Sequence, residues 1–291
     1  MNVPLCLPAA ADYSGRHGLH ALVVVRGSQT LLEEFGDGWN IERPHPLYSG
    51  TKSFWSILAC AAAEDGLLEL EECVCETLPA WEEAGKDRVR IRDLLSLTSG
   101  LPFGGLGAGV PTFEAAVNKP LAHSPGTTFT YSGIPLQVFG ALLSTKLASR
   151  SMTPLDYLNK RIFDRIGLRV DSWRSLKDGT ATLPTGAFLT TSDWAKFGAL
   201  LLAKGQWNGA RVVEPSSIEA CWRPGEVNPR YGLGFWLYGQ PEQNDFVAYA
   251  SGAGGQALYI LPAHDTVIVH FGQSNSYSHE RFLRRLLPQN A

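Results

Sequence analysis

Residues 49–65 read SGTKSFWSILACAAAED, a stretch that predicts a helix from Ser49 to Asp65. Gly66 follows it, and glycine is typical of the position just past a helix end. The chain before this helix looks different: residues 19–25 and 30–35 are rich in apolar and β-branched side chains and flank a short turn. A strand hairpin therefore precedes a segment that becomes helical near residue 49.

The pattern stays mainly helical to about Gly167, and strands return in the last third. Helices are expected at residues 90–98, 135–143, 153–166, 192–204 and 277–287, and strands at 231–238, 256–261 and 266–271. Strands from both ends would then join in one sheet. We therefore predict an α/β (α+β) fold, in which an antiparallel sheet flanked by helices carries an inserted mainly helical domain.

The expected domains are a discontinuous sheet domain, residues 1–48 and 184–291, and a helical domain, residues 49–183. Hydrophobic residues make up 44% of the chain and charged residues 18%, which indicates a globular protein. A net charge of -3 without a basic cluster argues against nucleic-acid binding. No apolar run is long enough for a membrane span.

The five cysteines are scattered, which favours a reduced compartment over a disulfide framework. No targeting signal is recognised at the amino terminus, so the expected location is cytoplasmic. The seven histidines show no metal-ligand spacing, and neither a metal nor an organic cofactor is expected. The oligomeric state stays open.

The segment Ser49-Gly-Thr-Lys52 carries the first candidate chemistry. If Ser49 begins the helix, Lys52 lies one turn further on the same face, within reach of the serine hydroxyl. The positive end of the helix favours a neutral lysine and stabilises an alkoxide. A neutral amine beside a hydroxyl can act as base and nucleophile. The alternative is a surface serine and lysine at an accidental spacing.

Two further segments indicate catalysis only in combination with the first. Tyr131 lies in the loop PGTTFTYSG, residues 125–133, where its phenol could exchange a proton with a nearby lysine. The alternative is a tyrosine packed in the core. The small residues of YASGAGGQ, residues 249–256, would let a substrate approach a strand edge whose N–H groups receive an oxyanion. The alternative here is a glycine-rich turn.

The order of these three segments resembles that of serine β-lactamases and penicillin-binding proteins. Further segments are similar to signatures of the class C branch, and together they span about residues 22–272: IRDLLSLTSGLP (91–102), PG (125–126), LTTSDWAKFG (189–198), WNG (207–209) and YGLG (231–234). This resemblance implies a β-lactamase/transpeptidase-like fold, with the active site at the junction of the two expected domains. It also implies that Ser49 attacks the substrate carbonyl and forms an acyl-enzyme.

The resemblance assigns roles to matching residues. Lys52 would take the serine proton and Tyr131 would assist, although their division of the base role stays open. The N–H groups of Ser49 and Gly252 would form the oxyanion hole. Trp236 is expected to line an acyl pocket. The other residues expected to contact the substrate are Gly133, Tyr249 and Ser251.

Two positions depart from the family pattern. The family's tyrosine motif usually ends in Asn, where this chain has Gly133. The third motif usually begins with Lys or His, whereas the aligned residues here are Tyr249, Ala250 and Ser251. A β-lactam carboxylate would lack its cation there. The segment SGAGGQ, residues 251–256, instead resembles the branch of carboxylesterases and 6-aminohexanoate-dimer hydrolases.

We therefore expect a serine hydrolase whose partner is a small-molecule ester or amide. Two alternatives remain open. One is a β-lactamase or D-peptidase of the same family. The other is a catalytically retired member that binds a ligand.

Overall fold

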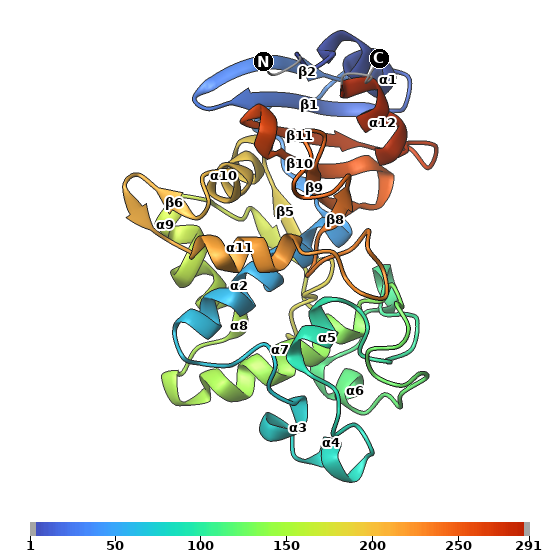
Figure 1. Ribbon diagram of the computed structural model, residues 1–291, viewed down its shortest axis with the longest axis vertical. Coiled ribbons are helices and arrows are strands. Elements are labelled where there is room, and N and C mark those ends of the chain that lie inside the picture. Colours follow the sequence, from blue (N-terminus) through green and yellow to red (C-terminus); the bar gives the residue numbers. More distant parts are fainter. Residues whose placement is uncertain (1–3, 288–291) are drawn as a thin grey trace.

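The computed structural model describes residues 4–287 and contains a six-stranded sheet in the order β2-β1-β11-β10-β9-β8 (Figure 1). Every neighbouring pair in it is antiparallel. The strands are β1 (Leu19–Arg26), β2 (Gln29–Phe35), β8 (Trp236–Tyr238), β9 (Val247–Gly252), β10 (Gln256–Leu261) and β11 (Thr266–Gly272). Because β1 pairs with β11, segments from both ends of the chain share one sheet, which confirms the predicted fold class.

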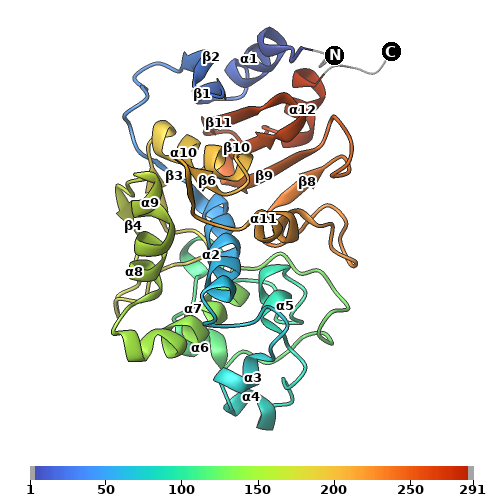
Figure 2. The ribbon, with the colours of Figure 1, turned by 60° about the vertical axis from the view of Figure 1, so that its left-hand side comes forward.

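Helices cover both faces of this sheet. Side chains alternate along a strand, so Tyr259 of β10 joins the outer core under α1 (Leu7–Gly15) and α12 (His279–Leu286). Leu258 and Ile260 face the opposite side, where α10 (Thr191–Leu202) packs. Figure 2 shows α10 beside the sheet and α2 below it.

Helix α2 (Lys52–Glu64) lies between the sheet and the helical half, and a 3₁₀ turn at Tyr48–Thr51 precedes it. Every residue from Lys52 to Ala62 is buried. A helix that is buried on all sides belongs to the core of the protein. Its amino-terminal turn therefore has a fixed position relative to both halves.

Most of the remaining elements are short, and α7, with 14 residues, is the exception. The other helices are α3 (Val74–Thr77), α4 (Ala80–Glu83), α5 (Ile91–Leu95), α6 (Phe113–Val117), α7 (Ile134–Leu147), α8 (Pro154–Leu158), a π-helical turn (Asn159–Phe163), α9 (Asp164–Ile166) and α11 (Pro215–Trp222). Strands β3 (His45–Pro46), β5 (Ala187–Leu189) and β4 (Ser172–Trp173) form one small sheet, and β6 (Gln206–Trp207) and β7 (Ala210–Arg211) form another. Within residues 4–287, no helix is long and apolar enough to cross a membrane.

The strand predicted at residues 231–238 is wrong over its first half, because only Trp236–Tyr238 is extended in the sheet. Gly234 has φ +70° and lies so close to α2 that a Cβ atom would be 2.3 Å from Ser56 Oγ. Its carbonyl accepts a hydrogen bond from Ser53 Oγ at 2.6 Å. The segment before β8 therefore follows the surface of α2 instead of pairing along β9. The two domain boundaries stay a prediction.

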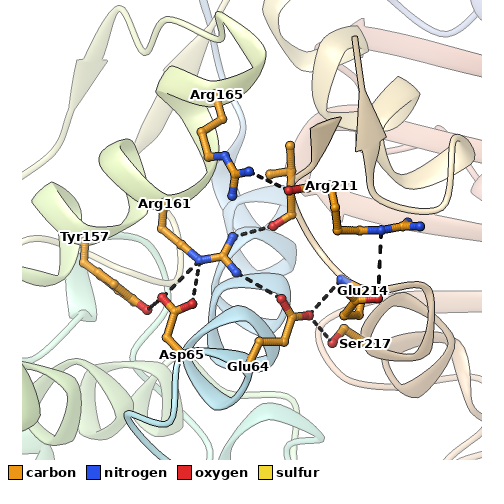
Figure 3. Close-up of polar contacts among 9 residues, drawn as sticks. Glu64, Asp65, Tyr157, Arg161, Arg165, Arg211, Glu214 and Ser217 are labelled. Carbon is orange, nitrogen blue, oxygen red and sulfur yellow. Dashed lines mark hydrogen bonds and ion pairs between the residues drawn. The ribbon is translucent and has the colours of Figure 1, made fainter. Parts of the chain in front are cut away.

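A polar network holds the carboxyl end of α2 (Figure 3). The guanidinium of Arg161 lies 3.0 Å from Glu64 Oε2 and 3.0 Å from Asp65 Oδ2. Asp65 also accepts a hydrogen bond from Tyr157 at 2.6 Å, and Glu64 accepts one from Ser217 at 2.6 Å. These contacts connect α2 with α8, the π-helical turn and α11.

We predict that Arg161→Ala lowers the free energy of unfolding by about 2–3 kcal/mol, because it leaves two partly buried carboxylates without their cation. Urea unfolding measures this. Arg16→Ala is the matched control, since Arg16 pairs with Asp12 on the open surface and its loss changes stability by less than about 0.5 kcal/mol. Equal effects of the two variants would contradict the role given to Arg161.

Candidate active site

Ser49 lies in the 3₁₀ turn that leads into α2, and the backbone around it is tightly constrained. Tyr48 has φ +46°, a left-handed conformation that is uncommon and costly for a residue with a side chain. Gly50 packs on Trp194, where a Cβ atom would lie 2.9 Å from the indole ring. The Gly50 N–H donates to Leu47 O at 3.0 Å. Ser49 is thereby presented at a fixed position, half-buried, at the start of the helix.

Lys52 is 1% exposed, and its Nζ lies 2.9 Å from Ser49 Oγ. The carbonyl of Pro184 is a second neighbour of this amine at 3.5 Å. Burial lowers the pKa of Lys52 to about 7, since a charged amine loses its hydration there. Near neutral pH a large fraction of Lys52 is therefore uncharged and able to accept a proton from the serine hydroxyl.

Tyr131 comes from the loop before α7 and completes a compact group with these two residues. The Nζ of Lys52 lies 4.9 Å from the centre of the Tyr131 ring. Burial raises the pKa of Tyr131, and hydrogen bonding with Ser49 and Trp236 opposes part of that rise. The phenol is therefore protonated near neutral pH, which makes it a proton donor beside the serine.

Aromatic side chains form one wall of this group. Trp236, the first residue of β8, lies 5.6 Å from Tyr131 between ring centres. Tyr231 lies 5.0 Å from Trp236, and Phe129 lies 5.2 Å from Tyr231. These four rings, called the aromatic wall (Phe129, Tyr131, Tyr231 and Trp236), place apolar side chains next to Tyr131. The acyl pocket expected at Trp236 stays a prediction.

Gly133 has a structural reason to lack a side chain. A Cβ atom at this position would be 1.8 Å from the carbonyl oxygen of Gly105. The Gly133 N–H donates to Gly104 O at 2.8 Å. The loop at residues 104–105 thus occupies the space in which the family's Asn would lie.

The third candidate segment, residues 249–256, brings its backbone close to Ser49, whereas two of its side chains point toward α12. Gly252 packs on Leu47, just before the turn that carries Ser49, and a Cβ atom at position 252 would be 2.1 Å from Leu47 O. Ser251 Oγ lies 2.8 Å from His279 Nε2, and the Tyr249 ring lies 5.4 Å from the His279 ring. The structure therefore groups Ser49 with Lys52, Tyr131 and Trp236, whereas the side chains of residues 249 and 251 contact α12.

Three contacts of this region have no signal in the sequence. The Pro184 carbonyl beside Lys52 and the Gly104 carbonyl at Gly133 are backbone groups that every residue carries. His279 reaches Ser251 from a helix far along the chain, where no motif surrounds it. Within residues 4–287, no group of His, Cys, Asp or Glu side chains is arranged to hold a metal ion.

Comparison with known proteins identifies the family. The family model described as Beta-lactamase matches residues 9–288, so the chain belongs to the Beta-lactamase family. No curated protein matches it by sequence. Membership of this family supports a hydrolase.

Three solved structures resemble the chain. A provisionally named 6-aminohexanoate-dimer hydrolase from Bacillus anthracis has a TM-score of 0.78 at 21% identity, covering 93% of this chain and 78% of that one. A class C β-lactamase from Rhodobacter sphaeroides has a TM-score of 0.71 at 17% identity, covering 96% of each chain. EstCE1, a hydrolase with promiscuous acyltransferase activity, has a TM-score of 0.74 at 16% identity, covering 95% of this chain and 96% of its own. At these identities the likeness establishes the fold.

Burial alone lowers the pKa of Lys52, which means that the fold disfavours its charged form. Methionine fills a similar space without a charge, so Lys52→Met should be more stable than the wild type near pH 7, by about 1–4 kcal/mol. The unfolded lysine binds its proton up to about pH 10.5, whereas the folded one releases it near pH 7. Wild-type stability therefore rises with pH across this window, and the advantage of the variant shrinks.

Urea unfolding of both proteins near pH 7 and near pH 9 measures the difference. Lys177→Met, at an exposed position, is the matched control and should change little at either pH. A Lys52→Met protein that is less stable than the wild type at both pH values would contradict the argument.

Proposed function

We propose that the protein is a serine hydrolase that cleaves esters or small amides through an acyl-enzyme. The observation that carries this proposal is the buried Lys52 amine, with its pKa lowered to about 7, at 2.9 Å from the Ser49 hydroxyl. A buried lysine without a carboxylate partner weakens a fold, so its position next to a hydroxyl argues for a catalytic task.

The proposed reaction begins when neutral Lys52 takes the proton of Ser49 Oγ and that oxygen attacks the substrate carbonyl carbon. The carbonyl oxygen becomes an oxyanion, which the N–H groups of Ser49 and Gly252 would stabilise. Tyr131 then gives its proton to the leaving alcohol or amine as the bond to it breaks, and Lys52 returns a proton to Tyr131. Water repeats the sequence on the acyl-enzyme and releases the acid.

Neutral substrates with an apolar acyl group fit the region best. The hydroxyl of Ser251 is engaged with His279, and position 249 is a tyrosine, so these two positions offer a carboxylate neither a cation nor a free hydroxyl. The aromatic wall instead offers contact to an apolar group. These features favour an ester or small amide over a β-lactam.

Our prediction for the nucleophile is that Ser49→Ala abolishes turnover of p-nitrophenyl acetate and butyrate while leaving the fold intact. The mutant lacks the attacking oxygen, and the smaller alanine side chain fits wherever the serine side chain does. Initial rates and circular dichroism of the two proteins provide the measurement. Tyr131→Phe should lower the rate roughly a hundredfold, as expected for a lost acid.

The same panel separates the alternatives when it includes a short amide and nitrocefin. Near wild-type rates in Ser49→Ala would disprove the nucleophile assignment. Efficient nitrocefin hydrolysis would favour the β-lactamase alternative. Absence of any turnover by the wild type would favour a retired, ligand-binding member.

The acid side of the pH profile provides a separate prediction. Protonated Lys52 cannot accept the serine proton, so kcat/KM should rise roughly tenfold per pH unit up to about pH 7 and level off above it. Stopped-flow or steady-state rates from about pH 5 to about pH 9 measure this. A flat profile over that range would contradict the role of neutral Lys52.

A further inference from the structure

A chain of side-chain hydrogen bonds lies under α12, on the outer face of the sheet. Ser251 Oγ of β9 lies 2.8 Å from His279 Nε2, and His279 Nδ1 lies 2.7 Å from the hydroxyl oxygen of Tyr259 of β10. That oxygen lies 3.0 Å from the hydroxyl oxygen of Tyr277. His279, the first residue of α12, is therefore bonded through both ring nitrogens to two neighbouring strands.

This polar chain lies in largely apolar surroundings, the outer core that includes Val24, Ile268 and Phe282. Burial lowers the pKa of His279 to about 4, so near neutral pH its imidazole is neutral and has one donor and one acceptor nitrogen. Apolar side chains would fill the same space without the cost of removing polar groups from water. What the hydrogen bonds add is a fixed length and direction between α12 and β9.

Ser251 belongs to the part of β9 that contacts the active-site turn. Its neighbour Gly252 packs on Leu47 so closely that a Cβ atom would lie 2.1 Å from Leu47 O. The same carbonyl accepts a hydrogen bond from the Gly50 N–H at 3.0 Å. The pairing of β9 with β8 ends at Tyr249, so residues 250–252 extend past that strand. The bond from Ser251 to His279 therefore tethers this end of β9, beside the turn that carries the nucleophile.

We infer that His279 is a positioning residue for the proposed hydrolysis: through its hydrogen bond with Ser251 it fixes the end of β9, and with it the Gly252 N–H, relative to the Ser49 turn. The inference rests on the proposed function, in which that N–H receives the oxyanion. A donor stabilises a developing charge because it is held in place beforehand, so a small displacement costs more rate than substrate binding. His279 lies on the outer face of the sheet and acts through Ser251.

The variants Ser251→Ala and His279→Leu remove this hydrogen bond from its two sides. We expect each to lower kcat for p-nitrophenyl butyrate roughly tenfold, with KM within about twofold of the wild type, because a displaced oxyanion donor affects mainly the transition state. The double variant should be no slower than either single one, since the two residues act as one unit. Ser251→Thr keeps the hydroxyl and should recover most of the lost rate.

The His279→Leu variant also separates positioning from direct contact with the substrate. If the Ser251 hydroxyl bound the substrate, its release from His279 would maintain or raise kcat. That result would overturn the inference. Losses that multiply in the double variant would overturn it as well, because they would show that the two side chains act independently.

Ser278→Ala is the matched control for the stability of α12. The Ser278 hydroxyl caps this helix by accepting the Arg281 N–H at 3.3 Å, so its loss should lower the melting temperature by a few degrees and leave kcat unchanged. His279→Leu should keep the melting temperature within about 3 °C, because leucine suits the apolar outer core. A kcat that follows the melting temperature across these variants would overturn the inference in favour of a purely structural role.

A boronic acid gives a readout that needs no turnover. Butylboronic acid adds to a serine hydroxyl and places a boron-bound oxygen where the oxyanion would form, so its Kd should rise roughly tenfold in Ser251→Ala. Ser49-dependent turnover together with an unchanged Kd would overturn this inference alone. A wild type without Ser49-dependent turnover would overturn the proposed function and the inference with it.

Discussion

Burial of the Lys52 amine beside Ser49 is the constraint on which the other features of the region depend. A lysine that is 1% exposed, with a hydroxyl and a carbonyl as its neighbours, is stable in the core only if it can give up its charge. Helix α2 enforces this burial, since the sheet half, α10 and the helical half surround it. The packing that stabilises the protein as a whole therefore also makes the amine a base near neutral pH.

Close backbone approaches bring the other parts of the region to the start of α2. At Gly133 the carbonyl of Gly105 takes the space of a side chain, and at Gly252 the carbonyl of Leu47 does the same. A larger residue at either point would push a neighbouring segment away from Ser49. The departure from the family's Asn at position 133 is therefore a consequence of how the loop at residues 104–105 packs, and does not leave a gap.

The sequence predicted the sheet, most helices and the grouping of Ser49 with Lys52, because periodicity and helical spacing are local properties. It could not predict that Ser251 faces α12. The alternation along a strand shows which residues share a face, but it does not show which element covers that face. Tertiary packing decided that: His279 of α12 holds the Ser251 hydroxyl. The half-strand error at residues 231–235 has the same origin, because the proximity of α2 overrode a pattern that is locally strand-like.

In the proposed mechanism, exclusion of water affects both the basicity of Lys52 and the preference for apolar substrates. Desolvation is the sole cause of the lowered pKa of Lys52, with no neighbouring charge involved. An apolar acyl group that packs on the aromatic wall would exclude more water from Ser49 and favour the neutral amine further. A charged substrate group would bring its own hydration to the same place and oppose this effect. The wall that would select apolar substrates would thus also help to activate the base that deprotonates the attacking Ser49 hydroxyl.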